Sequence, residues 1–148
     1  MSVFKIIPYI GYNDIKFHDS QEKVKQVDGL AQQIVIDNIM EEVYEHRQAS
    51  VKLTFIEERL ADVWIPQKPA DNQVYICNSI NMDIFDNQAF EILKVNYQWS
   101  ESKDKNRILF PELGICLWGF GKKKTKEGKM VIAFSDERLS WYKTFLQV

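Results

Sequence analysis

The chain has 148 residues, of which 45% are hydrophobic and 13% aromatic, with only 6 Gly and 4 Pro. This size and composition are typical of one globular domain and exclude a disordered chain. The net charge of −2 argues against a nucleic-acid-binding protein, because phosphate contacts require an excess of Lys and Arg.

Segments with the alternation or the β-branched runs typical of strands dominate the chain. The first is 4–12, and Pro8 within it predicts an edge strand, because proline cannot donate a ladder hydrogen bond. The other predicted strands, in chain order, are 34–36, 51–55, 61–65, 74–77, 115–120 and 130–134. Several of these are apolar on both faces, which is typical of central, covered strands.

Two segments carry the signals of helices. Residues 21–28 follow Asp19 and Ser20, which are good N-cap residues, and precede Gly29, which suits the position after a helix end. Residues 88–95 follow a similar Asp-Asn pair. Both predicted helices are short, so packing on a sheet must stabilise them.

Loops are expected at 66–72, 100–107 and 121–128. The first of them divides a single domain, 1–148, into two halves of about 1–68 and 69–148 that resemble each other. The helix caps match at an offset of 67 residues. At an offset of 79 residues, 51–60 aligns with 130–139, with these identical pairs: Phe55/Phe134, Glu58/Glu137, Arg59/Arg138 and Leu60/Leu139.

This order of elements predicts an α+β fold with a largely antiparallel sheet and two short helices packed on one face. An internal duplication explains the order physically, because one half cannot cover its own apolar sheet face whereas two halves together can. The alternative is a coincidental match between segments of similar hairpin composition.

Familiar catalytic and metal-binding motifs do not occur in the sequence. His18 and His46 are the only histidines, and they lack HxH, HExxH or His-Cys spacing. Gly119–Thr125 is similar to a phosphate-binding loop, but its spacing differs and it precedes a strand instead of a helix. We therefore expect a protein that is not an enzyme and binds no cofactor and no metal.

The two cysteines, Cys77 and Cys116, lie in apolar segments far apart and lack CxxC spacing, so we expect buried thiols. The N-terminus lacks the pattern of a secretory signal, and no window approaches 18 consecutive apolar residues. The sequence thus predicts a full-length cytoplasmic protein that does not enter a membrane.

Aromatic residues and charged turns are the candidate partner-binding positions. Tryptophan and tyrosine anchor protein interfaces, and carboxylates steer association with a basic partner. The candidates are Trp64, Trp99, Trp118, Trp141, Tyr142, Glu57, Glu58, Asp136, Glu137, Lys122, Lys123 and Lys124. The alternatives are tryptophans packed under a helix, solvated carboxylates at hairpin turns, and a lysine loop that keeps the adjoining strands soluble.

This short, acidic, aromatic-rich and sheet-dominated chain resembles the bacterial immunity proteins of toxin delivery systems. Its repeated helix-plus-meander layout is also similar to the repeats of secreted β-lactamase inhibitor proteins, although it lacks their signal peptide and paired cysteines. The resemblance covers the coarse layout of most of the chain and no diagnostic motif, so it assigns no functional residue.

The resemblance implies a non-enzymatic cytoplasmic binding protein, an immunity-type inhibitor that occludes a cognate toxin. We therefore expect a protein partner and no nucleic acid. Two alternatives remain open. One is a small-ligand-binding domain with a pocket between sheet and helices, and the other is a homo-oligomeric scaffold subunit.

Overall fold

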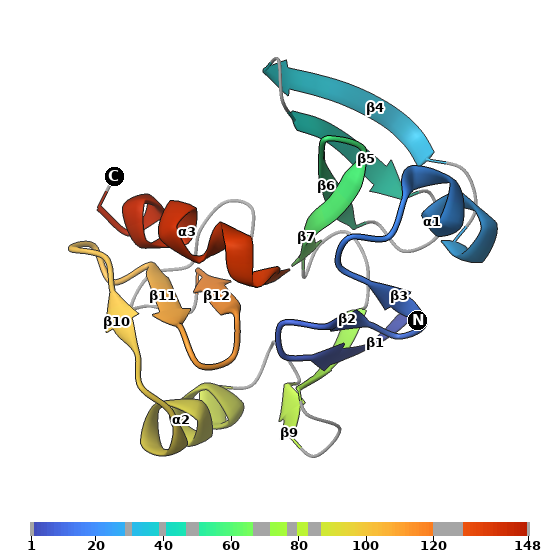
Figure 1. Ribbon diagram of the computed structural model, residues 1–148. Helices are drawn as coiled ribbons and strands as arrows, with labels where there is room; N and C mark the ends of the chain where they lie inside the picture. Colours follow the sequence, from blue (N-terminus) through green and yellow to red (C-terminus); the bar gives the residue numbers. More distant parts are fainter. Residues whose placement is uncertain are drawn as a thin grey trace.

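In the computed structural model, the described part of the chain forms two β-sheets and three α-helices (Figure 1). The described residues are 2–28, 31–38, 41–46, 51–66, 72–76, 80–82, 87–119 and 129–147. For β4, β5 and β9 the backbone pairing alone is described.

The smaller sheet has the strand order β3-β2-β1-β8-β9. Its strands are β1 (Ser2–Ile7), β2 (Gly11–Tyr12), β3 (Ile15–Lys16), β8 (Asn72–Ile76) and β9 (Ile80–Met82). The larger sheet has the order β10-β11-β12-β13-β7-β6-β5-β4. Its strands are β4 (Ala31–Asn38), β5 (Glu41–His46), β6 (Lys52–Ile56), β7 (Arg59–Pro66), β10 (Ser100–Glu101), β11 (Arg107–Phe110), β12 (Ile115–Trp118) and β13 (Met130–Phe134).

Antiparallel pairing dominates both sheets, and β1 with β8 is the parallel pair among the described strands. The helices are α1 (Gln21–Asp28), α2 (Asn87–Asn96) and α3 (Leu139–Phe145), and a 3₁₀ turn, η1 (Asp136–Arg138), leads into α3. The predicted α+β class with a largely antiparallel sheet is confirmed, with two sheets in place of one. None of the described helices has the length and apolarity needed to cross a membrane.

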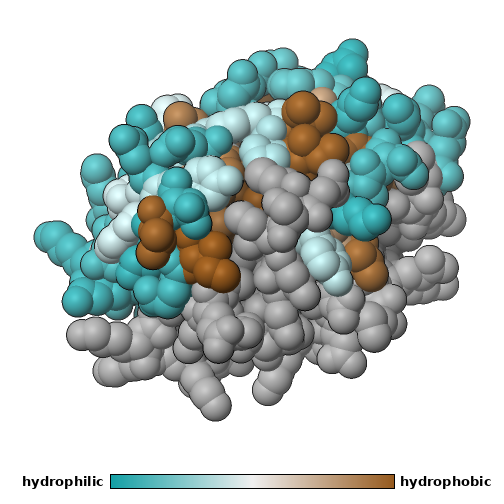
Figure 2. All heavy atoms as spheres, turned by 90° about the horizontal axis from the view of Figure 1, so that it is seen from below, coloured by the Kyte–Doolittle hydropathy of each residue, from teal (hydrophilic) through white to brown (hydrophobic). Residues whose placement is uncertain are grey.

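The outward face of the smaller sheet and one side of α2 leave apolar side chains in contact with solvent. The most exposed are Val3, Ile7, Ile10, Ile92 and Val95. Figure 2, seen from below the view of Figure 1, shows hydrophobic side chains in separate groups beside hydrophilic ones on this face. Scattered exposed apolar residues of this kind are common on soluble proteins and do not by themselves mark a binding site.

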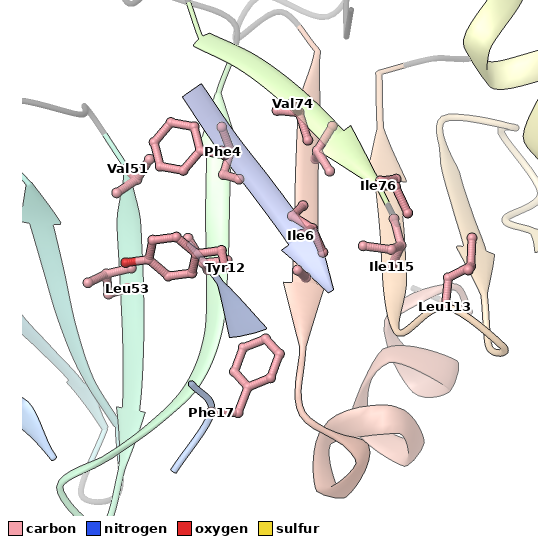
Figure 3. Close-up of a cluster of buried hydrophobic side chains, with 14 of the residues drawn as sticks. Phe4, Ile6, Tyr12, Phe17, Val51, Leu53, Val74, Ile76, Leu113 and Ile115 are labelled. Carbon is pink, nitrogen blue, oxygen red and sulfur yellow. The ribbon is translucent and has the colours of Figure 1, made fainter. Parts of the chain in front are cut away.

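The main hydrophobic core lies between the two sheets (Figure 3). Phe4 and Ile6 of β1 point from the smaller sheet toward the larger one, where Leu53 of β6 and Ile115 of β12 face them. The alternation predicted for 51–55 is confirmed, because Val51, Leu53 and Phe55 are all buried in this core.

The two predicted helices form at the expected positions. Ser20 caps α1, because its Oγ accepts a hydrogen bond from the Lys23 backbone N–H at 3.2 Å. Val24 of α1 and Leu93 of α2 are both buried in the core between the sheets. These two helices therefore cover the same side of the larger sheet, as predicted. Gly29, the residue expected after the end of α1, lies outside the described residues.

The third helix, α3, covers the opposite face of the larger sheet. Tyr142 and Leu146 pack there against Cys116 of β12 and against Ile132 and Phe134 of β13. No helix is predicted from the sequence at the position of α3. Cys116 is fully buried, which confirms its prediction as a buried thiol, and this burial raises the pKa of the thiol to about 12. Cys77 lies outside the described residues.

The prediction of an edge strand at 4–12 is wrong. β1 ends at Ile7 and is paired on both sides, with β2 and β8, so it is central in the smaller sheet. Pro8 lies after the strand, in the turn to β2, where it removes no ladder hydrogen bond. The expected loop 100–107 connects β10 to β11, and its first two residues and its last residue belong to these strands. The expected loop 121–128 lies outside the described residues.

The order of elements repeats in the two halves of the chain. Each half runs from a short set of strands through a helix into four strands of the larger sheet, and β7 and β13 join these two sets at its centre. The segments aligned at the 79-residue offset nevertheless fold differently. Residues 51–60 form a hairpin, whereas 130–139 form a strand followed by η1 and the start of α3, so Asp136 and Glu137 do not lie in a hairpin turn as predicted.

Candidate functional site

A buried polar network joins β7 to the start of α3. Asp62 is fully buried, and its Oδ2 accepts hydrogen bonds from Arg138 Nε at 3.3 Å, Arg138 Nη2 at 3.2 Å and the Tyr142 hydroxyl at 2.7 Å. The Tyr142 hydroxyl in turn accepts a hydrogen bond from Trp64 Nε1 at 3.0 Å. The spacing explains the network: Asp62 and Trp64 share one face of a strand, and Arg138 and Tyr142 are one helical turn apart.

Burial is the largest influence on the two acidic groups of this network. Burial raises the pKa of Asp62, while the Arg138 charge and hydrogen bonds from Thr54, Tyr142 and Arg138 oppose the shift. Burial together with the neighbouring Asp62 raises the pKa of Tyr142 well above its usual value. Asp62 Oδ1 lacks a hydrogen bond of good geometry among the described residues. The carboxyl group therefore depends on Arg138 for its compensation.

Aromatic rings surround this network on the α3 side. Trp64 and Trp118 lie edge to face, with ring centroids 6.2 Å apart, and Phe145 of α3 contacts both rings. Trp141 stacks on Phe145 at 5.4 Å, and the Arg138 guanidinium lies 4.4 Å from the Trp141 ring. The contacts made by Trp64 and Trp118 are thus packing contacts under a helix.

A cavity of about 440 Å³ opens where the β6–β7 hairpin meets η1 and α3, and we call it the acidic cleft. Its lining residues are His18, Ile56, Glu57, Arg59, Leu60, Ala61, Ser135, Glu137, Arg138 and Trp141. Leu60 and Ala61 are buried apolar parts of this lining, and Ser135 and Arg138 are buried polar parts. Glu57, Glu137 and His18 are exposed. This is the pattern of a site that buries part of a ligand and orients it by a few polar groups.

The β6–β7 hairpin that forms one wall of the cleft has an unusual turn. Ile56 pairs with Arg59, so Glu57 and Glu58 form a two-residue connection, and both have positive φ, 51° and 65°. Asn-Gly or Asp-Gly is the usual choice there, because a side chain with a Cβ is strained at positive φ. The same turn borders a second cavity of about 400 Å³ against the first turn of α1.

His18 forms the opposite corner of the cleft and is also held at positive φ, 76°. Its backbone N–H donates to the Leu60 carbonyl at 2.9 Å, and its carbonyl accepts a hydrogen bond from Arg59 Nη1 at 3.1 Å. His18 Nε2 lies 3.9 Å from Glu137 Oε1. Strained non-glycine residues concentrate at functional sites more than elsewhere, so His18 and Glu57 in the lining of one cavity, with Glu58 beside them, favour a role for the cleft.

The exposed carboxylates of Glu57, Glu58, Asp136 and Glu137 line or adjoin the cleft, whereas Arg59 is the exposed guanidinium in its lining. Asp136 adjoins Glu137 at the start of η1, and its charge acts together with burial to raise the pKa of Tyr9. Arg138 is ion-paired with the buried Asp62, and Arg59 donates a hydrogen bond to the His18 carbonyl. The cleft is therefore suited to a positively charged group.

The structure brings some of the predicted site residues together. Glu57, Glu137 and Trp141 line the acidic cleft, and Glu58 and Asp136 adjoin it. These residues come from the β6–β7 hairpin and from the segment of η1 and α3, which are far apart in the sequence, and Trp141 is 40% exposed.

Other predicted site residues lie elsewhere. Tyr142 is fully buried, so it supports the cleft from below and cannot contact a partner. Trp99 lies between α2 and β10, with the Lys94 ammonium 4.3 Å from its ring, and makes no ring contact with the α3 cluster among the described residues. Lys122, Lys123 and Lys124 lie outside the described residues.

Sequence reasoning missed three residues of the site: His18, Asp62 and Arg138. A single Asp among apolar residues of a central strand was a signal for a buried partner, as was Trp64 two positions later on the same face. The helix that supplies Arg138 also had a signal, because Ser135-Asp136-Glu137 is a typical N-terminal turn. His18 had no signal, since its neighbours in the cleft are distant in sequence.

Comparison with protein-family models, with curated proteins and with solved structures finds no match for this chain.

Proposed function

We propose that the chain is a non-enzymatic binding protein whose acidic cleft receives a basic side chain of a protein partner. The observation that supports it is the convergence of Glu57, Glu137 and the partly exposed Trp141 around one cavity that Ile56, Leu60 and Ala61 also line. A lysine or arginine side chain matches this lining, because its aliphatic stem needs an apolar wall and its head needs carboxylates.

The carboxylates of the acidic cleft also favour a basic partner. Carboxylates at the mouth of a cleft raise the association rate of a basic partner, and aromatic anchors at its centre supply affinity. The immunity-type inhibitor is the specific form of this proposal, in which the partner is a toxin and the cleft covers part of its functional surface. The buried Asp62–Arg138 pair supports binding indirectly, since it fixes the residues on either side of the cleft.

The test is affinity capture from the native host with the wild-type protein and with Glu57→Lys/Glu137→Lys as bait. We expect a stoichiometric partner on the wild type that is lost from the double variant and released by salt. Glu91→Lys on the exposed side of α2 is the matched control and should retain the partner.

The identity of the captured protein then decides between a general protein-binding role and the specific immunity-type role. A partner whose toxicity to cells is neutralised by the wild type but not by the double variant supports the immunity-type role. Equal capture by the wild type and Glu57→Lys/Glu137→Lys, or a partner without a basic surface, would refute docking in the cleft.

A small-ligand role is the second candidate, and the size of the cleft favours it. Its volume of about 440 Å³ lies in the range of about 300–1,000 Å³ found for ligand pockets. A saturable rise in melting temperature with cationic metabolites, lost in Trp141→Ala, would support this role over a protein partner.

A further inference from the structure

Three side chains able to bind a metal meet at the mouth of the acidic cleft. His18, Asp136 and Glu137 each offer one ligand atom, and these atoms all lie within 4.8 Å of one another. We propose that they form a binding site for a divalent first-row transition cation, with zinc as the best match. This site shares Glu137 and the mouth of the acidic cleft with the partner-binding proposal, but metal binding does not require the partner.

The positions of the ligands suit a small cation after a modest closure. In a tetrahedral site, bonds of about 2.0–2.2 Å to nitrogen and oxygen place neighbouring ligand atoms about 3.3–3.6 Å apart. His18 and Glu137 side chains are 49% and 75% exposed, so both can rotate toward a shared ion. His18 Nε2 and Glu137 Oε1, 3.9 Å apart, are too distant for a hydrogen bond, and a bridging cation fits between them.

The backbone that carries these ligands is held in place, although the side chains are exposed. A backbone hydrogen bond to Leu60 and a hydrogen bond from the Arg59 side chain attach His18 to the start of β7. η1 begins where the Ser135 N–H donates to the Ala61 carbonyl of the same strand at 2.9 Å. Both ligand-bearing segments are therefore fixed to β7, and the ion would bridge two segments that are already neighbours.

The chemistry of the ligands selects the class of metal. An imidazole with two carboxylates suits Zn²⁺ and similar borderline cations, whereas Ca²⁺ and Mg²⁺ prefer sites made of oxygen ligands. Three protein ligands leave a coordination position open toward the cleft, as in zinc sites that hold a water or a substrate. Two adjacent carboxylates also repel each other, and a bound cation removes this repulsion.

The test is isothermal titration of the purified protein with zinc chloride. We expect saturable binding of one ion per chain. His18→Asn and Asp136→Asn should each weaken it by about ten-fold or more, since loss of a ligand is at least as costly as loss of a residue that supports one. Asn is chosen at position 18 because it tolerates positive φ better than Ala.

Three controls keep the test decisive. His46→Ala removes the other histidine and should bind zinc like the wild type. Magnesium and calcium chloride should bind far more weakly than zinc. Thermal unfolding in the presence of a chelator should show that His18→Asn and Asp136→Asn remain folded.

Absence of saturable binding at one ion per chain would overturn the proposal. So would zinc binding that survives His18→Asn but is lost in His46→Ala, or equal binding of magnesium and zinc. None of these results bears on the protein-partner proposal, because the titration uses the protein alone.

Discussion

Replacing Arg138 by methionine tests whether the buried network depends on charge compensation. Asp62 is fully buried and Arg138 Nη2 lies 3.2 Å from its Oδ2, with 9% of the Arg138 side chain exposed. Removing one partner of a buried ion pair costs about 3–5 kcal/mol, because the remaining charge is left uncompensated. The lost contact with the Trp141 ring adds about 0.5–1 kcal/mol.

The loss of stability in Arg138→Met should depend on pH with a definite sign. Without Arg138, the pKa of the Asp62 carboxyl in the folded protein rises further above its value in the unfolded chain, about 3.9. Between these two values the folded state binds more protons than the unfolded state, so its stability falls as pH rises. The loss of unfolding free energy in the variant should therefore be smaller at pH 5 than at pH 7. The difference is up to about 1.4 kcal/mol for each pH unit between the two pKa values.

Urea denaturation followed by tryptophan fluorescence measures these differences. Adding Asp62→Asn to Arg138→Met should recover more than about 1 kcal/mol at pH 7, because no charge then remains buried. Lys52→Met is the matched control: its ammonium lies 4.7 Å from the Trp64 ring, and its loss should cost less than about 1 kcal/mol at both pH values. The reasoning is wrong if Arg138→Met costs no more than the control, or if Asp62→Asn gives no rescue.

Three further predictions concern the turn, a glycine and a thiol. Replacing Glu57 and Glu58 by Asn-Gly should stabilise the protein by about 1–2 kcal/mol, because the turn at positive φ would no longer be strained; an unchanged urea midpoint would contradict this. Gly11→Ala should lower stability by about 3 kcal/mol or more, since its Cβ would lie 2.1 Å from a backbone oxygen of β3, and a melting temperature near that of the wild type would count against it. In a Cys77→Ser background, Cys116 should stay unreactive toward a thiol reagent at pH 8 until urea unfolds the chain, because its pKa is about 12; rapid labelling of the native protein would refute its burial.

Patterns of local sequence predicted most of the strands and the helices α1 and α2. The alternation in 51–55 and the cap at Ser20 were sufficient, because each depends on neighbours in the chain. β1 was misplaced because Pro8 was taken to interrupt a strand that in fact ends before it. The parallel pairing of β1 with β8 brings together residues some 70 positions apart, and no local signal reports it.

Only part of the candidate site was predicted, because its residues meet through long-range pairing that local sequence does not report. Carboxylates at positions 57 and 137 were recognised as charged turns, but their meeting around one cavity depends on the pairing of β7 with β13. The 79-residue alignment treated Arg138 as the counterpart of Arg59 in a second hairpin. In the structure Arg59 is exposed and donates to the His18 carbonyl, whereas Arg138 is buried against Asp62. Identical residues therefore carry different contacts in the two halves.

The strain around the cleft gives the strongest physical reason to look for function there. Glu57, Glu58 and His18 each occupy positive φ although Asn or Gly would be more stable at those positions. The fold compensates for this strain through the β6–β7 ladder and the hydrogen bonds that attach His18 to β7. Unlike Asn or Gly, Glu57 and Glu58 place carboxylates, and His18 an imidazole, at or beside the mouth of one cavity. An Asn-Gly turn that raises stability and also weakens partner binding would show that the strain is kept for these side chains, whereas a gain in stability without a loss of binding would make the turn irrelevant to the site.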